Sequence, residues 1–273
     1  MSSSTAADWE TIRPLVERTI GSAHLTRQID AGPNSDIALV VRSEKGLYFV
    51  KGQLRGRPGG VTHGREASVN PMVRHLSPVL QWRAKDDVWD LLGFDFVKGR
   101  RANYKPKSRD LHAVLHLILR LQMVRPPNED TRSAWFKTAP ERWRDYTDDP
   151  ELFAGEALLH TDWNPENVLI VGDRALLVDW TWPTWGARWI DPVCWALWLI
   201  ASGHDPALTE EWAGHLPSWH DASPAAVTEF IAAQQRMWAS IAAERSPAAL
   251  RDTDRWIAEL AEAAAHWLDY RKR

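Results

Sequence analysis

The sequence lacks the features that mark secreted and membrane-spanning proteins. Its 273 residues include a single cysteine, Cys194, so an internal disulfide is excluded. The longest apolar run, residues 193–201, is nine residues long, far short of the roughly 20 that cross a bilayer. The first residues contain neither the basic nor the apolar segment of a secretory signal. We therefore expect a cytoplasmic protein that does not span a membrane.

A strong charge of either sign is also missing. The chain has 33 Lys and Arg residues against 36 Asp and Glu residues, a formal net charge of −3. Such a chain has no overall basic field that would attract nucleic acid or an anionic membrane, so we expect neither as a partner. The motifs GxxxxGK[S/T], GxSxG and HExxH are absent, which argues against the enzyme classes built on them.

Tryptophan, in contrast, is abundant, with 17 residues. A tryptophan side chain buries a large area and has one N–H group to satisfy, so most of them are expected to pack in the core. One or two are expected to line a ligand cleft.

Hydrophobic periodicity divides the chain into two parts. After a short amphipathic helix at 9–20, the apolar runs 37–42 and 47–51 predict an antiparallel hairpin. A helical segment around Glu66 and two further extended runs, 79–83 and 89–97, follow. From residue 110 onward the pattern is mainly helical, interrupted by a second hairpin at 168–171 and 175–179. The sequence predicts an α+β protein with a small antiparallel-sheet lobe, residues 1–97, and a larger helical lobe, residues 98–273.

The segment His160-Thr161-Asp162-Trp163-Asn164-Pro165-Glu166-Asn167 carries the clearest chemical pattern. It reads HxDxxxxN, and Asp179 follows Asn167 by twelve residues, after an apolar run. A hairpin of this length brings Asn167 and Asp179 to the same end of two adjacent strands, with Asp162 on the loop at that end. Amide and carboxylate oxygens are ligands that Mg²⁺ prefers. The pattern predicts a magnesium site beside a reactive carboxylate.

This pattern resembles the kinase-fold phosphotransferases, and most of all the aminoglycoside phosphotransferase family of small-molecule kinases. The resemblance implies a two-lobed, protein-kinase-like fold. It implies that Asp162 accepts or orients the hydroxyl group of the acceptor, and that Asn167 and Asp179 bind Mg²⁺. His160 is expected to orient the loop, and Asp191, at the end of the segment 186–191, is expected to brace it.

The resemblance extends upstream of this segment. Tyr48-Phe49-Val50-Lys51 is similar to the strand whose lysine contacts the nucleotide phosphates, and Glu66, fifteen residues later, fits the ion-pair partner of that lysine. The stretch 92–99 is similar to the strand and hinge between the lobes. The backbone of Asp95, Phe96 and Val97 would then meet the adenine edge.

Three departures from the protein kinases limit the resemblance. The phosphate-covering turn, residues 31–36, has one glycine, although Asn34 and Ser35 offer N–H and hydroxyl donors. Thr161 and Asn164 replace the arginine and lysine of the protein-kinase loop, which argues against a protein substrate. Only eleven residues separate Asp179 from Asp191, too few for an activation loop controlled by phosphorylation.

We therefore expect an ATP-dependent or GTP-dependent, Mg²⁺-requiring phosphotransferase acting on a hydroxyl of a small molecule, such as an aminoglycoside-like antibiotic or a metabolite. Glu210, Glu211 and Asp221 in the helical lobe favour a cationic acceptor. The alternative is a pseudokinase, which binds nucleotide or a partner without turnover, and its motivation is the glycine-poor turn. A protein kinase is the third and disfavoured reading.

Overall fold

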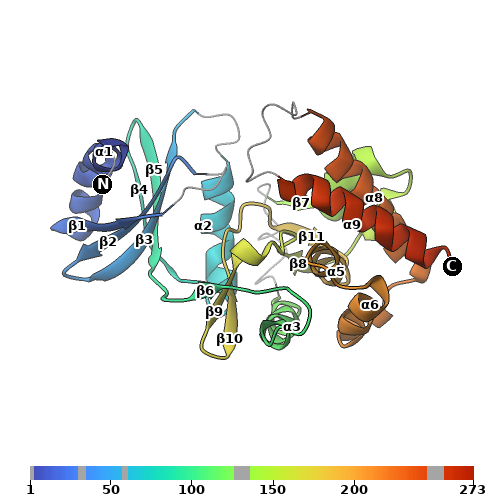
Figure 1. The fold of residues 1–273 in the computed structure, drawn as a ribbon. Coiled ribbons are helices and arrows are strands. Elements are labelled where there is room, and N and C mark those ends of the chain that lie inside the picture. The colour runs from blue at the N-terminus through green and yellow to red at the C-terminus, as the bar shows by residue number, and fades with distance from the viewer. Residues whose placement is uncertain (1–2, 30–34, 57–60, 126–135, 245–254) are drawn as a thin grey trace. The chain divides into compact units, whose positions relative to one another are not determined.

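The computed structural model describes residues 3–29, 35–56, 61–125, 136–244 and 255–273, which fall into two compact units. The first consists of Met1–Gly99 with Leu176–Trp182, and the second of Arg100–Ala175 with Pro183–Arg273. The expected α+β class is confirmed, since the N-terminal part forms an antiparallel sheet and the C-terminal part is mainly helical (Figure 1). The expected lobe limits, 1–97 and 98–273, stay a prediction. Within the described residues, no helix has both the length and the apolar character needed to cross a membrane.

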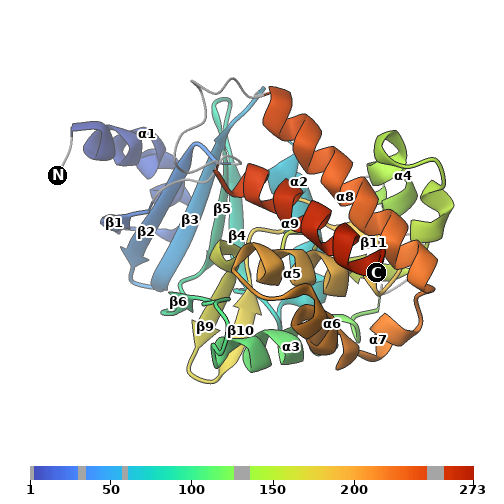
Figure 2. The same ribbon diagram turned by 45° about the vertical axis from the view of Figure 1, so that its right-hand side comes forward.

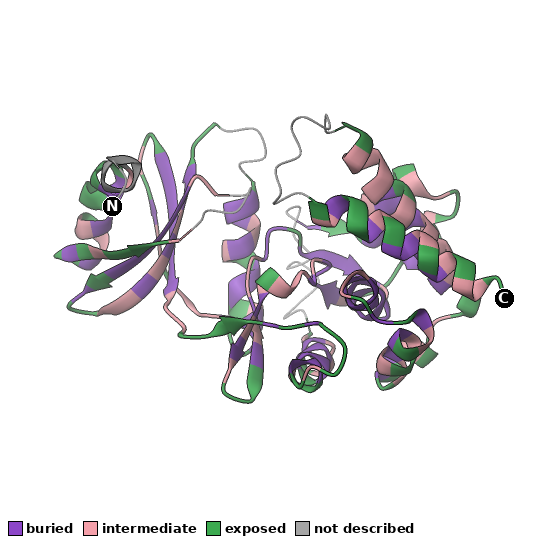
Figure 3. Ribbon diagram, in the orientation of Figure 1, coloured by how far each residue is buried: buried purple, intermediate pink, exposed green. Residues whose placement is uncertain are grey.

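A five-stranded antiparallel sheet forms the first unit. Its strands follow the spatial order β1 (Ala23–Gln28), β2 (Ile37–Ser43), β3 (Gly46–Leu54), β5 (Trp89–Asp95) and β4 (Leu80–Lys85). The sheet and helix α1 (Ser3–Ile20) share an apolar core that includes Trp9, Ile12, Leu39, Val50 and Leu91. Figure 3 shows the buried residues running along the strands. The sequence analysis did not predict strand β1.

Helix α2 (Thr62–Val73) is fixed to the sheet by buried polar side chains. Three anchors share this role: the Gln53 amide donates to Thr62 Oγ1 (3.1 Å), His63 Nδ1 lies 3.0 Å from the Asp90 carbonyl oxygen, and Asn70 bonds both the Pro78 carbonyl (2.9 Å) and the Leu80 N–H (2.8 Å). Because buried polar groups require partners, these bonds specify one placement of the helix. They thereby fix the position of Glu66, which lies between the anchors.

The second unit contains two small sheets and most of the helices. One sheet has the order β10 (Arg174–Leu177), β9 (Val168–Val171), β6 (Arg100–Arg101), and the other β7 (Lys137–Thr138), β11 (Thr184–Gly186), β8 (Ala157–Leu159). The helices are α3 (Asp110–Leu121), α4 (Ala139–Trp143), α5 (Ile190–Ala201), α6 (Pro206–Gly214), α7 (Pro217–His220), α8 (Pro224–Glu244) and α9 (Arg255–Arg271), with short 3₁₀ turns at Arg144–Tyr146, Pro150–Phe153 and Pro165–Asn167.

Aromatic side chains and apolar helices build the core of this second unit. Helix α5 is almost entirely buried, and α8 and α9 lie along each other (Figure 2). Trp143, Phe153, Trp189 and Phe230 pack edge to face, with ring centroids 4.8–6.4 Å apart. This is the arrangement that aromatic quadrupoles favour.

Gly93 provides a test of packing in the first sheet. It lies on β5, and a Cβ atom added there would fall 2.0 Å from Cε2 of Trp82. We expect Gly93→Ala to lower the free energy of unfolding by about 1–3 kcal/mol, because the indole must shift. Urea denaturation measures this change. Gly214→Ala is the matched control, since nothing lies within 4 Å of an added Cβ at Gly214. Equal stability of the two variants would contradict the packing described.

His63 predicts a pH-dependent contribution to stability. Burial, followed by the charge of Lys51, lowers the pKa of His63 to about 4 from an ordinary value of 6.5. The unfolded chain therefore binds more protons between these values, so this contribution is complete above pH 6.5 and is lost as the pH falls toward 4. Between pH 7 and pH 5 the loss is on the order of 2 kcal/mol.

Urea denaturation at both pH values tests this prediction. We expect His63→Asn to show a smaller loss of stability than the wild type between pH 7 and pH 5. The same substitution at the exposed His116 is the control. An unchanged pH dependence in His63→Asn would show that His63 does not carry the effect.

Candidate active-site residues in the two units

In the first unit, one ammonium group lies between two carboxylates. Strand β3 carries Lys51 and helix α2 carries Glu66. Nζ of Lys51 donates to both carboxylate oxygens of Glu66, each at 3.1 Å, and to Oδ1 of Asp179 at 2.9 Å. The side chains of Lys51 and Glu66 are 11% and 4% exposed, while that of Asp179 is 23% exposed. We call these three residues the lysine cluster.

The lysine cluster holds its charges despite burial. Burial alone would lower the pKa of Lys51, but the charges of Asp179 and Glu66 outweigh it and hold this pKa above its ordinary value. Burial raises the pKa of Glu66, and the charge of Lys51 opposes that shift. With all three groups ionised, the cluster has a net charge of −1, which favours a cation beside Asp179.

The short segment Leu176–Trp182 brings Asp179 to this cluster. The Leu177 N–H donates to the Leu76 carbonyl (2.8 Å), and the Trp180 indole N–H donates to Ser77 Oγ (2.8 Å). Between these attachments Asp179 has a left-handed backbone, with φ of 64°. Asx residues adopt this conformation more readily than most others, yet it still carries strain, and such strain concentrates at functional sites.

In the second unit, a buried carboxylate holds the backbone in front of Asp162. Asp191, at the start of α5, accepts the N–H of His160 with one oxygen (3.0 Å) and the N–H of Thr161 with the other (2.8 Å). Its side chain is almost fully buried, and burial raises its pKa to about 6. Nδ1 of His160 accepts the Asp162 N–H at 3.3 Å. The roles of these residues in catalysis stay predictions.

Asn167 stands at the end of the 3₁₀ turn that follows Asp162. The turn forms because the Asn164 side chain accepts the Glu166 N–H (2.9 Å) and Pro165 begins it. Nδ2 of Asn167 donates to the Asp162 carbonyl at 3.3 Å, which turns the amide oxygen of Asn167 toward other partners. That oxygen is a suitable ligand for a hard cation.

Of residues 95–97, which are expected to contact a nucleotide base, two use their backbone N–H groups in hydrogen bonds within the chain. The Asp95 N–H donates to the Val79 carbonyl (2.9 Å) and the Phe96 N–H to the Leu47 carbonyl (3.0 Å). Within the described part of the chain, this leaves the Val97 N–H as the donor that a base could use. Asn34 lies outside the described residues, and Ser35 is half-buried just before β2.

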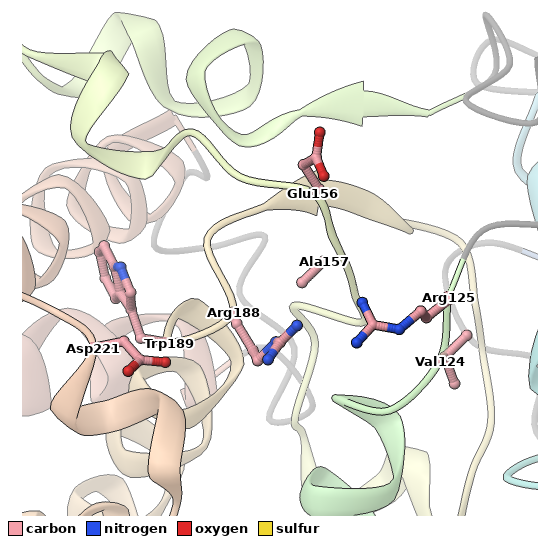
Figure 4. Close-up of a pocket in the computed structure, with 7 residues that line it drawn as sticks. All are labelled: Val124, Arg125, Glu156, Ala157, Arg188, Trp189 and Asp221. Carbon is pink, nitrogen blue, oxygen red and sulfur yellow. The ribbon is translucent and has the colours of Figure 1, made fainter. Parts of the chain in front are cut away.

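Two further features of the second unit escaped the sequence analysis. Arg142 on α4 donates to the hydroxyl oxygens of Thr161 (2.6 Å) and Thr184 (2.9 Å). A pocket of about 300 Å³, into which the guanidinium groups of two arginines extend, is lined by Val124, Arg125, Glu156, Ala157, Arg188, Trp189 and Asp221 (Figure 4). Asp221, one of the acidic residues expected to favour a cationic acceptor, lines this pocket, and the residues expected to act in catalysis or to bind nucleotide or metal do not. Arg142 lies in a stretch without a motif, whereas Arg188 and Trp189 of the pocket lie in the segment 186–191, which was singled out for Asp191 alone.

The chain matches no protein-family model and no curated protein sequence. It is similar to solved structures over almost its whole length. The choline kinase LicA from Streptococcus pneumoniae superposes with a TM-score of 0.66 at 12% identity, over 98% of this chain and 100% of that one. Aminoglycoside phosphotransferase APH(4)-Ia gives 0.59 at 12% identity, over 97% and 99% of the two chains.

A third structure, a choline/ethanolamine kinase family protein from Mesorhizobium loti, gives a TM-score of 0.58 at 14% identity, covering 100% of this chain and 94% of the other. APH(4)-Ia has been solved with ADP and hygromycin B, and LicA with AMP. At these identities the likeness establishes the fold. This chain has the protein-kinase-like fold of the aminoglycoside phosphotransferases and choline kinases.

Proposed function

We propose that the protein transfers the γ-phosphoryl group of ATP or GTP to a hydroxyl group of a small molecule. The observation that carries this proposal is the lysine cluster, a buried ammonium held by two carboxylates in a chain with the fold of small-molecule kinases. Replacing a buried ion pair with apolar side chains is often neutral or stabilising, so a cluster of this kind calls for a functional reason.

The proposal assigns groups of the first unit to the nucleotide. Lys51 binds the α- and β-phosphates, and Glu66 keeps its ammonium in place. Phosphoryl transfer depends mainly on positioning and on charge stabilisation, because the protein contributes little covalent chemistry. Ser35, Asn34 and the backbone at 95–97 are assigned to the remainder of the nucleotide. Among the fold relatives, the structures with ADP and AMP support a nucleotide ligand.

Asn167 and Asp179 are proposed to bind a magnesium ion, because each offers an oxygen of the kind that Mg²⁺ prefers. Asn167 offers an amide oxygen, and Asp179 offers a carboxylate in a cluster whose net charge is −1. Mg²⁺ in such enzymes is usually held by one or two protein oxygens together with water and phosphate oxygens. When bound, it neutralises phosphate charge.

Asp162 is proposed to bind the acceptor. Its carboxylate would accept the hydrogen of the acceptor hydroxyl and orient the oxygen for attack. His160 and Asp191 hold the backbone from which Asp162 projects. Placement of reacting groups in this way supplies a large part of the rate enhancement in enzymes.

The acceptor is proposed to be a small hydroxylated molecule, such as an antibiotic or a metabolite. Glu210 is engaged within the chain by Arg271 and by the Trp267 indole N–H (2.8 Å), so it gives no support for a positive charge on the acceptor. Asp221 lines the pocket that also contains Arg125 and Arg188. Of the three acidic residues that suggested a cation, Glu211 alone keeps its basis, so the proposal commits to the hydroxyl group.

A screen of hydroxylated antibiotics and metabolites tests the proposal. We expect the wild type to give an ATP-dependent mass gain of one phosphate on at least one compound. Asp162→Asn should lower kcat by about 10²–10⁴-fold, the range typical of a general base. Lys51→Met should abolish transfer, while the same substitution at the exposed Lys272 should leave it unchanged.

Two outcomes would favour other readings. Nucleotide binding without transfer to any compound, with equal ATP hydrolysis in wild type and Asp162→Asn, would indicate a pseudokinase. Phosphate appearing on added proteins and on no small molecule would indicate a protein kinase.

The metal assignment makes a separate prediction. A ligand that binds only the native state raises its apparent stability, so Mg²⁺ with a non-hydrolysable ATP analogue should raise the Tm. We expect EDTA to remove most of this shift in the wild type and Asp179→Asn to remove most of it in the presence of Mg²⁺. The quantity compared is the shift within each variant, since Asp179→Asn also breaks the ion pair with Lys51. A shift of full size in Asp179→Asn would contradict the assignment.

A further inference from the structure

Arg142 links three elements of the second unit at the loop that carries Asp162. One nitrogen of its guanidinium group, Nη1, donates to Thr161 Oγ1 at 2.6 Å and to Thr184 Oγ1 at 2.9 Å. Both threonines are buried. Thr184 pairs with Leu159 across strands β11 and β8, and the loop begins directly after Leu159. Arg142 thus ties the loop to the strand beside its starting point.

Helix α4 holds Arg142 firmly in this place. The helix begins with a reciprocal capping box between Thr138 and Glu141. The neighbouring Trp143 is buried and packs against Phe230 with ring centroids 4.8 Å apart. The guanidinium carbon of Arg142 lies 4.9 Å from the centre of the Trp143 ring. An arginine stacked and anchored in this way loses little further freedom when it bonds the threonines.

Thr161 needs such support because its backbone is strained. Its φ is 67°, in the left-handed region that β-branched residues rarely adopt. Residues in sparsely populated backbone regions cost of order 1–3 kcal/mol, and they persist where the surroundings over-determine them. Asp191 binds the N–H of Thr161, and Arg142 binds its hydroxyl group. The two charged residues therefore hold Thr161 by its backbone and by its side chain.

The conformation of Thr161 determines where Asp162 points, since the two residues share a peptide unit. Rotation of Thr161 to an ordinary negative φ would redirect the Asp162 backbone. It would also disturb the bonds from the Asp162 N–H to His160 Nδ1 and from Asn167 Nδ2 to the Asp162 carbonyl. Arg142 donates to the hydroxyl group of Thr161, the residue that directly precedes the carboxylate-bearing Asp162.

We propose that Arg142 is a positioning residue that keeps Thr161 in its left-handed conformation and thereby aims Asp162. The inference rests on the proposed function for its catalytic consequence and on the contacts above for its structural one. Arginine at 142 suits this role because its planar group carries several donors in a fixed geometry, whereas a lysine ammonium is a point charge on a flexible stem.

Hydrogen exchange of the full-length protein tests the structural part without any substrate. We expect Arg142→Met to speed exchange of the His160 and Thr161 amides by about tenfold or more, as loss of a hydrogen bond from a charged donor predicts. Arg236→Met is the matched control, because Arg236 bonds the Tyr146 carbonyl (2.6 Å) and Glu229 (2.6 Å) and so anchors the same part of the chain away from the loop. Unchanged exchange at 160–161 in Arg142→Met, or the same change in Arg236→Met, would overturn the inference.

Kinetics with an acceptor from the screen test the catalytic part. We expect Arg142→Met to lower kcat by about tenfold to a hundredfold with the KM for ATP within about twofold, and Arg142→Lys to recover part of the loss. Thr161→Ala should lower kcat similarly while Thr161→Ser restores it, and the double variant Arg142→Met/Thr161→Ala should be no slower than either single variant. A rise in KM with kcat unchanged would overturn the inference.

The two failures can be told apart. A wild type that transfers no phosphate would refute the proposed function, and the exchange comparison would still decide whether Arg142 holds the loop. If Arg142→Met does not fold, amide exchange can instead be compared between Thr161→Ala and Thr161→Ser, which both keep Arg142. Equal exchange at His160 in these two variants would then count against the inference.

Discussion

The lysine cluster, formed by Lys51, Glu66 and Asp179, is the constraint on which the arrangement of the first unit depends. Removing one partner of a buried ion pair typically costs 3–5 kcal/mol, because it leaves an uncompensated charge. Strand β3, helix α2 and the segment Leu176–Trp182 must therefore keep their mutual positions. The polar anchors of α2 and the attachments of Leu177 and Trp180 serve this requirement. Asp179 is the most exposed member of the cluster.

In the second unit, charged side chains also fix the position of a segment, the loop that carries Asp162, but through different contacts. The buried carboxylate, Asp191, accepts backbone N–H groups, and the half-buried cation Arg142 donates to hydroxyl oxygens. In the first unit the charged side chains bond one another. In the second unit Asp191 bonds the backbone N–H of Thr161 and Arg142 bonds its hydroxyl group. Among the described residues other than glycine, Lys107, Thr161 and Asp179 have positive φ values, and two of these three lie at the groups assigned to catalysis. Strain of this kind is retained where geometry matters more than stability.

Much of this arrangement could be predicted from local sequence, and some of it could not. Alternating apolar runs with tight turns indicate the antiparallel sheet. The resemblance to the kinase-fold phosphotransferases implied that Lys51 and Glu66 pair, and the structure contains this ion pair. The spacing of Asp162, Asn167 and Asp179 predicts a common site, and both that site and the roles of the three residues stay predictions. Strand β1 was missed because its exposed polar side chains show no apolar alternation. The grouping of Leu176–Trp182 with the first unit depends on bonds to Leu76 and Ser77, about a hundred residues earlier in the chain, and no local pattern encodes them.

The contacts of Arg142 and Glu210 show the same limit more sharply. Arg142 reaches Thr161 across 19 residues and Thr184 across 42, and Arg271 reaches Glu210 across 61. In sequence each of these charged residues lies among polar neighbours, where a solvent-exposed position is the ordinary expectation. Packing decides otherwise: Trp143 beside Arg142, and Trp267 one turn before Arg271, bury apolar surface and bring the guanidinium groups inward.

The raised pKa of Asp191 shows what the second unit gives up for this geometry. Because its folded value of about 6 exceeds the ordinary 3.8, the folded state binds more protons than the unfolded chain between these values. The free energy of unfolding therefore falls as the pH rises from about 4 to about 6 and Asp191 ionises. Above pH 6 the carboxylate is charged, and the full free-energy cost of burying that charge applies. The ionised carboxylate is nevertheless the form that best accepts two N–H groups, and the hydrogen bonds from the His160 and Thr161 backbone oppose the rise in the pKa of Asp191 that burial causes. The retained charge is explained by its effect on the backbone of His160 and Thr161, and through them on Asp162.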